Sequence, residues 1–246
     1  MVTRLATAAA LVVVAAALVV FVAVAAVIGS EASRGRHYRG AKCAGTRKYE
    51  VTLRFNWSGR THPRSYSKGG NFSPPTVAAH TSHYQMWSPG SFASTGIQTA
   101  AKTGDPAPLR EELKLYEKAG HVSSWAGTDA PTSSGGGTVK LTVTANAATG
   151  AVYVSGATML FPSPDWFTGF DAVPVCRHGQ WVGKVRGRLT FWGSGTDSGR
   201  THSAEDVETK PPTTIFSLNN RGFPADATPV GSYTIRAMSD HFQWSG

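Results

Sequence analysis

Residues 49–57 read YEVTLRFNW, and this stretch decides the fold class. Apolar and polar side chains alternate along it, from Tyr49 to Trp57. A period of two puts one set of side chains on a buried face and the other set in solvent, which is the pattern of a strand in an antiparallel sheet. The chain is therefore expected to be built on sheets that have one solvated face.

The rest of the chain supplies further short strands, separated by turns rich in Gly, Pro and Asp. We expect strands at residues 139–143, 151–161, 170–176, 180–191, 213–218 and 230–238. The first two are expected to pair as a hairpin through the turn from Asn146 to Gly150. Two short helices are expected at residues 91–102 and 106–119. This pattern predicts an all-β antiparallel sandwich with short helical insertions.

An apolar segment precedes these elements. Residues 5–28 contain no charged side chain and consist almost entirely of Ala, Val and Leu. As a helix they would span a bilayer, whereas the apolar part of a cleaved signal is usually about 7–15 residues long. Small residues near its end would nevertheless suit a peptidase, so residues 1–29 are either a transmembrane anchor or a signal sequence. Residues 30–42 are expected to be a basic flexible linker, and residues 43–246 the folded domain.

The formal charge of +9 has to be located before it is interpreted. The first 50 residues hold seven basic and two acidic side chains, so more than half of the excess lies beside the apolar segment. This distribution is typical of a membrane-flanking linker and not of a groove for phosphates. We therefore expect a membrane contact through residues 5–28 and no nucleic-acid partner.

The two cysteines bear on the compartment. Cys43 follows the linker and Cys176 lies far downstream. By number alone they are as readily two buried thiols as one disulfide, although an export-type N-terminus favours the disulfide. The basic linker argues the other way, because the positive-inside tendency would keep the following domain in the cytoplasm.

The sequence motifs that could indicate a catalytic site are incomplete. His80 and His83 have the spacing of a metal half-site, but no third ligand is evident, so two polar loop histidines are the better interpretation. The string GSGTDSG at residues 193–199 lacks the spacing of a nucleophile elbow. A serine hydrolase and a histidine metal site are therefore not expected.

Carboxylates are concentrated in one stiff stretch. Residues 161–171 read FPSPDWFTGFD and contain Asp165 and Asp171. Together with Asp197 they could form a hard-oxygen site for Ca²⁺. Asp165 and Asp197 could instead be the acid and nucleophile of an extracytoplasmic glycan-acting hydrolase. The third interpretation is that Asp165 only caps its own turn.

A basic stripe is expected in the strand at residues 180–191. Lys184, Arg186 and Arg188 alternate with other residues, so all three project from one face. Sulfated glycans or acidic lipids would suit such a stripe. The pattern favours the simpler interpretation of a solvated edge strand whose charges oppose edge-to-edge pairing.

Four stretches, taken together and in order, resemble the spondin N-terminal domain of the F-spondin and mindin type. They are FNWS at 55–58 with His62, Pro63 and Tyr66, HTSHYQMW at 80–87, PSPDWFTG at 162–169, and GTDSG at 195–199. The resemblance implies a C2-like antiparallel β-sandwich that is extracytoplasmic and non-enzymatic and acts in cell adhesion or matrix attachment. Its partner would be a glycan or protein of the matrix or cell surface. The resemblance also implies a disulfide between Cys43 and Cys176, which outweighs the positive-inside argument.

The resemblance further implies a calcium ion at one edge of the sandwich, and here the sequence departs from the family. Asp165 matches the aspartate of PSPDW, but Gly193 replaces the aspartate that precedes GTDSG, and the third acidic position falls on Asn146. Losing two carboxylates weakens the attraction for a dication. Weak calcium binding or none is expected, unless Asp171, Asp197 or carbonyl oxygens compensate.

Overall fold

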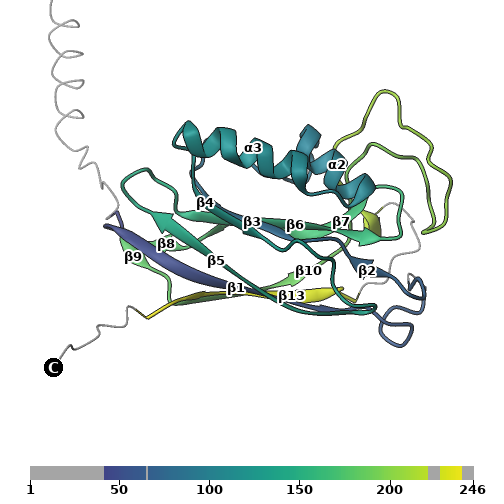
Figure 1. The fold of residues 1–246 in the computed structure, drawn as a ribbon, viewed down its shortest axis with the longest axis horizontal. Coiled ribbons are helices and arrows are strands. Elements are labelled where there is room, and N and C mark those ends of the chain that lie inside the picture. The colour runs from purple at the N-terminus through teal and green to yellow at the C-terminus, as the bar shows by residue number, and fades with distance from the viewer. Residues whose placement is uncertain (1–41, 65, 221–227, 240–246) are drawn as a thin grey trace, which may run out of the picture. The chain divides into compact units, whose positions relative to one another are not determined.

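Two antiparallel sheets packed face to face form the folded part of the chain, as shown by a computed structural model that describes residues 42–64, 66–220 and 228–239 (Figure 1). The first sheet has the order β10-β13-β1-β5. Its strands are β1 (Thr46–Asn56), β5 (Gly136–Asn146), β10 (Lys184–Leu189) and β13 (Gly231–Ala237). The antiparallel sandwich expected from the sequence is confirmed.

The second sheet has the order β12-β11-β7-β6-β3-β4, and β2 pairs with β6 beside this path. Its strands are β2 (Asn71–Phe72), β3 (Thr76–His80), β4 (Val122–Gly127), β6 (Tyr153–Phe161), β7 (Trp166–Pro174), β11 (Trp192–Gly193) and β12 (Phe216–Ser217). A small hairpin joins β8 (Cys176–Arg177) to β9 (Gln180–Trp181), and a short 3₁₀ turn, η1 (Leu218–Asn220), follows β12. The two helices are α2 (Thr95–Thr103) and α3 (Ala107–Lys118).

The chain divides into two units, residues 1–40 and 41–246, and every described residue belongs to the second. The predicted anchor or signal sequence at residues 1–29 and nearly all of the predicted linker at residues 30–42 lie outside the described residues. Within the described residues, no helix is long and apolar enough to cross a membrane.

Strand β1 lies in the interior of the first sheet and supplies one wall of the core. It pairs with β13 on one side and with β5 on the other. Tyr49, Val51, Leu53 and Phe55 are buried between the sheets, and the intervening side chains point outward, as the alternation predicts. The Phe55 ring stacks on Phe72 of β2 with ring centroids 4.1 Å apart, which links the two sheets.

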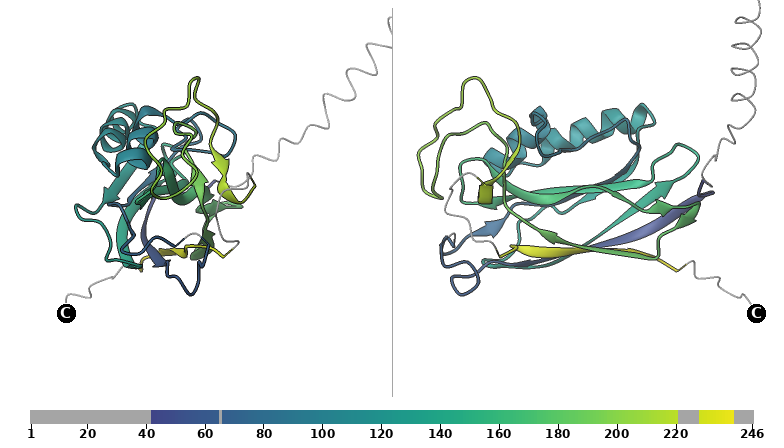
Figure 2. Two further views of the ribbon diagram at one scale, coloured as in Figure 1. Left: turned by 90° about the vertical axis from the view of Figure 1, so that its right-hand side faces the viewer. Right: turned by 180° about the vertical axis from the view of Figure 1, so that it is seen from behind.

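Both helices lie on the side of the second sheet that faces away from the first (Figures 1 and 2). Ser94 caps α2 by accepting a hydrogen bond from the Ile97 amide, and the buried faces of the helices carry Ile97 and Leu113 into a second apolar cluster. That cluster also contains Ala157 of β6 and Phe167 of β7. The second sheet is therefore covered on both faces, whereas no described helix covers the outer face of the first sheet.

The predicted hairpin between residues 139–143 and 151–161 is wrong. Strand β5 pairs with β1 in the first sheet, and β6 pairs with β3 and β7 in the second. Only one bridge, between Asn146 and Ala151, joins the two segments. The turn carries the chain from one sheet to the other, because each strand finds a longer partner elsewhere than its neighbour in sequence.

The free edge of β5 is closed by side chains of β4. The Thr144 amide donates to Ser124 Oγ at 2.6 Å, and the Thr144 carbonyl accepts from Ser123 Oγ at 2.6 Å. Strand β10, at the opposite edge of the first sheet, pairs only with β13 among the described strands. Side-chain hydrogen bonds from β4 therefore close one edge of the first sheet. At the other edge, β10 has a described neighbouring strand on one side only.

Candidate functional site

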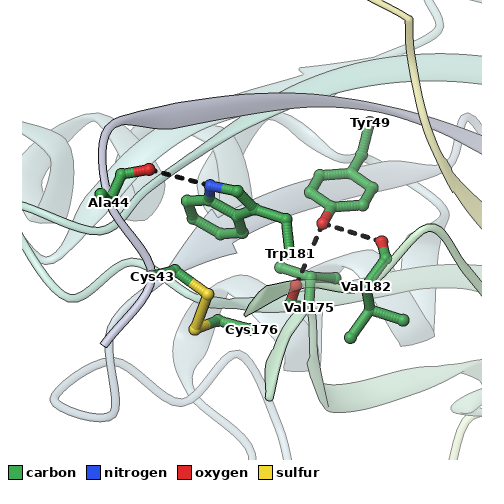
Figure 3. The surroundings of a disulfide bond; sticks show 7 residues. All are labelled: Cys43, Ala44, Tyr49, Val175, Cys176, Trp181 and Val182. Carbon is green, nitrogen blue, oxygen red and sulfur yellow. Dashed lines mark hydrogen bonds between the residues drawn. A yellow bond between two sulfur atoms is a disulfide. The ribbon is translucent and has the colours of Figure 1, made fainter. Parts of the chain in front are cut away.

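Cys43 and Cys176 form the expected disulfide, which joins two positions 133 residues apart in sequence (Figure 3). Beside it, the Trp181 indole N–H donates to the Ala44 carbonyl at 2.9 Å. The Tyr49 hydroxyl lies 3.0 Å from the carbonyl oxygens of Val175 and Val182 and donates to them. Burial raises the pKa of Tyr49 to about 12, so the hydroxyl keeps its proton. These contacts hold the start of β1 against the β8–β9 hairpin.

Asp165 precedes β7 and is fully buried. Its Oδ2 accepts hydrogen bonds from the Thr196 amide at 2.8 Å, the Asp197 amide at 3.1 Å and the Ser194 hydroxyl at 2.9 Å. Its Oδ1 is buried and has no hydrogen-bond partner among the described residues. The donors come from the GTDSG loop and from Ser194 just before it, and not from the turn of Asp165 itself. The carboxylate therefore holds the PSPDW loop against the GTDSG loop, and we call this pair of hydrogen-bonded loops the clasp. The interpretation that Asp165 only caps its own turn does not describe these bonds.

Asp197 is the second carboxylate of this clasp, and only 4% of it is exposed. Its Oδ1 accepts from the Gly199 amide at 2.7 Å and its Oδ2 from the Val207 amide at 3.1 Å. The Lys102 ammonium lies 3.9 Å from Asp197 Oδ2 and 2.6 Å from Asp206. Burial and the neighbouring Asp206 carboxylate raise the pKa of Asp197, whereas Lys102 is the main group that lowers the pKa of Asp206.

The structure brings Asp165 and Asp197 together, but as buried hydrogen-bond acceptors. A hydrolase pair has to face a substrate and a water molecule. Here, three of the four carboxylate oxygens already accept hydrogen bonds from the polypeptide, and both side chains are almost wholly out of solvent. The arrangement holds two loops together and offers no open face for a sugar ring.

The calcium ligands suggested by the resemblance are not assembled. Asn146 bridges Ala151 just before β6, whereas Asp165 follows the other end of that nine-residue strand, so about 30 Å separates the two residues. Asn146 instead accepts from the Ala148 amide at 2.9 Å within its own turn. Asp171 lies about 17 Å along β7 from Trp166. The pairing of Asp165 with Asn146 at one metal site is therefore not supported by their placement.

Gly193 supplies no carboxylate at the position where the family pattern has an aspartate. It lies in β11, and a Cβ built on it would come within 2.6 Å of Phe216 Cζ. Among the described residues, no group of three or more His, Cys, Asp and Glu side chains is placed to hold a metal ion. Since Ca²⁺ takes six to eight oxygens, the single free carboxylate oxygen of Asp165 does not make a fitting donor set.

His80 and His83 do not share a site. His80 ends β3 and is buried, with Nδ1 2.8 Å from the Thr81 carbonyl and Nε2 2.8 Å from the Ser155 hydroxyl. Burial lowers the pKa of His80, which keeps the ring neutral. His83 is exposed, and its ring is tilted by 32° against that of His121, with ring centroids 5.5 Å apart. The interpretation of His80 as a polar loop residue is wrong, because its side chain belongs to the buried end of a strand.

The outward side chains of the first sheet form a second candidate site, which we name the basic face. Strand register arranges them in three rows across the strands β10, β13, β1 and β5. The rows are Lys184-Arg236-Glu50-Thr142, Arg186-Thr234-Thr52-Lys140 and Arg188-Ser232-Arg54-Thr138. All three residues of the predicted stripe are therefore exposed on one face, and further cations join them from the other three strands.

A groove of about 590 Å³ crosses the basic face. Its lining includes five cationic side chains and one carboxylate: Arg54, Lys140, Lys184, Arg186, Arg236 and Glu50. Glu50 pairs with Lys140, with Nζ 3.3 Å from Oε2, and accepts a hydrogen bond from the Thr52 hydroxyl. Partial burial and the nearby guanidinium groups of Arg186, Arg236 and Arg54 lower the pKa of Lys184. The cations are thus close enough to repel one another, and an anion would relieve that repulsion.

The sequence favours a solvated edge strand as the explanation of the basic stripe, and β10 does lie at an edge of the first sheet. The edge position does not account for Arg54 and Arg236, which lie on the interior strands β1 and β13. Sequence analysis missed these two residues and Lys140. Their own alternation marks them as outward-facing, but it does not say which strands are neighbours.

Comparisons with known proteins agree on one family. A family model described as Spondin_N matches residues 47–230. Spondin-1 of Rattus norvegicus is 33% identical over 201 residues, covering 74% of this chain and 23% of the relative. Spondin-2 of Homo sapiens is 28% identical over 181 residues, covering 70% of this chain and 53% of the relative. The chain thus spans about a quarter of Spondin-1 and about half of Spondin-2. Matching over most of its length, the chain belongs to the spondin N-terminal (Spondin_N) family.

Proposed function

We propose that this chain is an extracytoplasmic, non-enzymatic binding module that attaches to the cell surface or the extracellular matrix. Residues 5–28 would tether it to a membrane or direct its secretion. Membership of the spondin family supports the proposal, and so does the Cys43–Cys176 disulfide, since such bonds persist in oxidising compartments.

The non-enzymatic character in this proposal rests on one observation, the way in which the PSPDW and GTDSG loops are held together. Asp165 and Asp197 are buried and accept hydrogen bonds from loop amides. A catalytic carboxylate pair needs contact with the substrate, and these two groups instead hold PSPDW against GTDSG. The loops therefore act as a rigid end of the sandwich.

We also propose that the module works without a resident calcium ion. Gly193 stands where the family pattern has an aspartate, and Asn146, which was matched to the third acidic position, lies at the other end of β6 from Asp165. Of the three matched positions, only Asp165 therefore brings a carboxylate to this end of the sandwich. The positive charge near Asp197 comes from Lys102 of the chain itself. Attachment would then persist in the presence of a chelator.

The test uses the oxidised full chain, kept in mild detergent and coated on beads. We expect the beads to be retained on intact cells and on cell-free matrix of the source organism, in calcium and in EDTA alike. We expect no reducing ends to be released from a panel of polysaccharides, with or without the substitution Asp165→Asn. Hydrolysis that disappears in Asp165→Asn would establish the glycan-acting enzyme in place of a binding module, and beads that attach to neither surface would refute attachment.

A further inference from the structure

The basic face gathers six cationic side chains on four neighbouring strands. The strand β10 contributes a complete column of cations, Lys184, Arg186 and Arg188, spaced about 7 Å apart. Across the sheet, Arg236, Arg54 and Lys140 supply cations on the other three strands. Between these cations the groove is lined by Thr234, Ser232 and Thr52, of which Thr52 is buried and donates its hydroxyl to Glu50. The face thus combines cationic sides with a floor that can form hydrogen bonds.

We propose that the basic face binds a sulfated glycan chain, and this inference rests on the proposed function because it names the partner of that binding module. The guanidinium groups of Arg54, Arg186 and Arg236 present paired N–H donors that match the oxygens of a sulfate group. The floor hydroxyls match the hydroxyl groups of a sugar ring. A groove that runs across an open sheet accepts a linear chain without any change in the sandwich.

The basic face lacks the exposed apolar and aromatic side chains with which proteins bind acidic membranes and single-stranded nucleic acid. Of the exposed large hydrophobic side chains in the described ranges, Phe92, Leu115, Tyr116, Phe161 and Val207 lie on other elements, and only Met238 follows β13 at the end of the face. A membrane-binding surface inserts apolar and aromatic side chains into the headgroup region, and single-stranded nucleic acid stacks on aromatic rings. Tyr233 lines the groove, but its ring stacks on Phe170 in the core, with ring centroids 4.4 Å apart. Cations and hydroxyls without an exposed aromatic ring favour a sulfated glycan over both.

Glu50 sets an opposing charge inside the groove. It lies opposite Arg236 in the register and pairs with Lys140 at 3.3 Å. A sulfate that approaches this end of the groove meets the carboxylate and has to compete for Lys140. Removing the charge of Glu50 should therefore strengthen binding, whereas removing cations should weaken it.

The experiment measures retention of the oxidised full chain on immobilised heparin at low salt, followed by elution with a salt gradient. We expect Lys184→Ser, Arg186→Ser and Arg188→Ser together to abolish retention at low salt and to lower affinity by at least about tenfold. The matched control removes three exposed cations elsewhere, with Lys68→Ser, Lys118→Ser and Arg177→Ser. We expect the control to elute close to wild type, and equal losses in both triple variants would show a net-charge effect and overturn the site.

Further arms separate the ligand classes. The substitution Glu50→Gln should move elution to higher salt, and an unchanged or earlier elution would contradict the groove. Desulfated heparin should not retain wild type, and equal retention would contradict sulfate recognition.

A vesicle experiment tests an acidic membrane as the partner. All variants carry the same residues 5–28, so differences between them in binding to phosphatidylcholine vesicles with and without phosphatidylserine report on the basic face. If vesicle binding depended on the β10 cations and heparin binding did not, an acidic membrane would replace the glycan as the partner.

Melting temperatures of every variant show whether it is folded, and we expect them to match wild type because the substituted side chains are exposed. The outcome also distinguishes the inference from the proposed function. Attachment to cells and matrix without heparin retention would refute the basic face as the site and leave the binding module intact, with its loops as the alternative surface. If the wild-type chain neither attaches to cells or matrix nor is retained on heparin, the proposed binding module itself is refuted.

Discussion

Asp165 joins two loops that lie about 30 residues apart in sequence. Its Oδ2 accepts hydrogen bonds from the amides of Thr196 and Asp197, and its Oδ1 has no partner in the part of the chain that the structure describes. A buried carboxylate is costly unless hydrogen bonds compensate it, so this residue stabilises the fold only through its donors. At the scale of single residues, the aspartate of the PSPDW string therefore joins two loops of the chain.

We expect Asp165→Ala to lower the free energy of unfolding by about 2–4 kcal/mol, because the buried amides of Thr196 and Asp197 lose their acceptor. Asp165→Asn keeps an acceptor oxygen and should cost less than half as much. Denaturant unfolding of both variants and wild type measures the difference. An unfolding free energy unchanged in Asp165→Ala would contradict the clasp.

Calcium provides a separate measurement at the same residue. We expect no change in melting temperature when about 1–5 mM calcium replaces EDTA, because a site without matching donors gains no ligand-linked stability. Scanning calorimetry of the oxidised chain provides the measurement, with magnesium as the ionic-strength control. A calcium-specific rise that is absent in Asp165→Ala would show that the clasp binds the ion after all.

At the scale of elements, α2 and α3 pack together at a glycine. A Cβ built on Gly96 of α2 would come within 2.7 Å of Leu109 Cα and 2.8 Å of Glu112 Oε2 in α3. The Leu109 contact is with backbone, which cannot turn away like the end of a long side chain. Gly96 therefore sets how closely the two helices approach.

We expect Gly96→Ala to destabilise the chain by about 1–3 kcal/mol, because the clash exceeds the gain in helix propensity of about 1 kcal/mol. The matched control is Gly183→Ala, where a Cβ would meet nothing within 4 Å and the backbone has no positive φ. Thermal and denaturant unfolding compare the two variants. Equal stability of Gly96→Ala and Gly183→Ala would mean that the helices separate at little cost.

The strands show which elements a sequence pattern can predict. β1 was identified because one face is buried and the other is solvated, and its alternation is clean. β3 was missed because all five of its residues are buried, so Thr76–His80 has no alternation to detect. The β5–β6 hairpin was predicted from a good turn, but a turn determines only that the chain reverses, and not which sheet each arm joins.

At the scale of the whole molecule, the disulfide closes a loop of 133 residues and ties the first strand to the β8–β9 hairpin. Its surroundings, with Trp181 bonded to Ala44 and Tyr49 to Val175 and Val182, form one end of the sandwich (Figure 3). The cross-link therefore acts on the whole domain and not on a local turn.

We expect the double variant Cys43→Ser, Cys176→Ser to lose about 4–5 kcal/mol of unfolding free energy, since cross-linking so long a loop restricts the unfolded chain. Denaturant unfolding compares the variant with wild type, and wild type treated with a reductant should unfold at the same midpoint as the variant. Stability that does not change when the bond is removed would show that the hydrogen bonds around it suffice to hold this end.

The order of amino acids is enough to predict the sandwich class, the inward set of β1, the Cys43–Cys176 disulfide and the common orientation of Lys184, Arg186 and Arg188 on one strand face. These follow from residue type, local periodicity and family resemblance, which are all readable along the chain. The three-dimensional arrangement is needed to see that Arg54, Lys140 and Arg236 extend the stripe into a basic face, and that Asn146 lies about 30 Å from Asp165. The reason is that strand neighbours are chosen by contacts between residues far apart in sequence, and alternation within one strand carries no information about them.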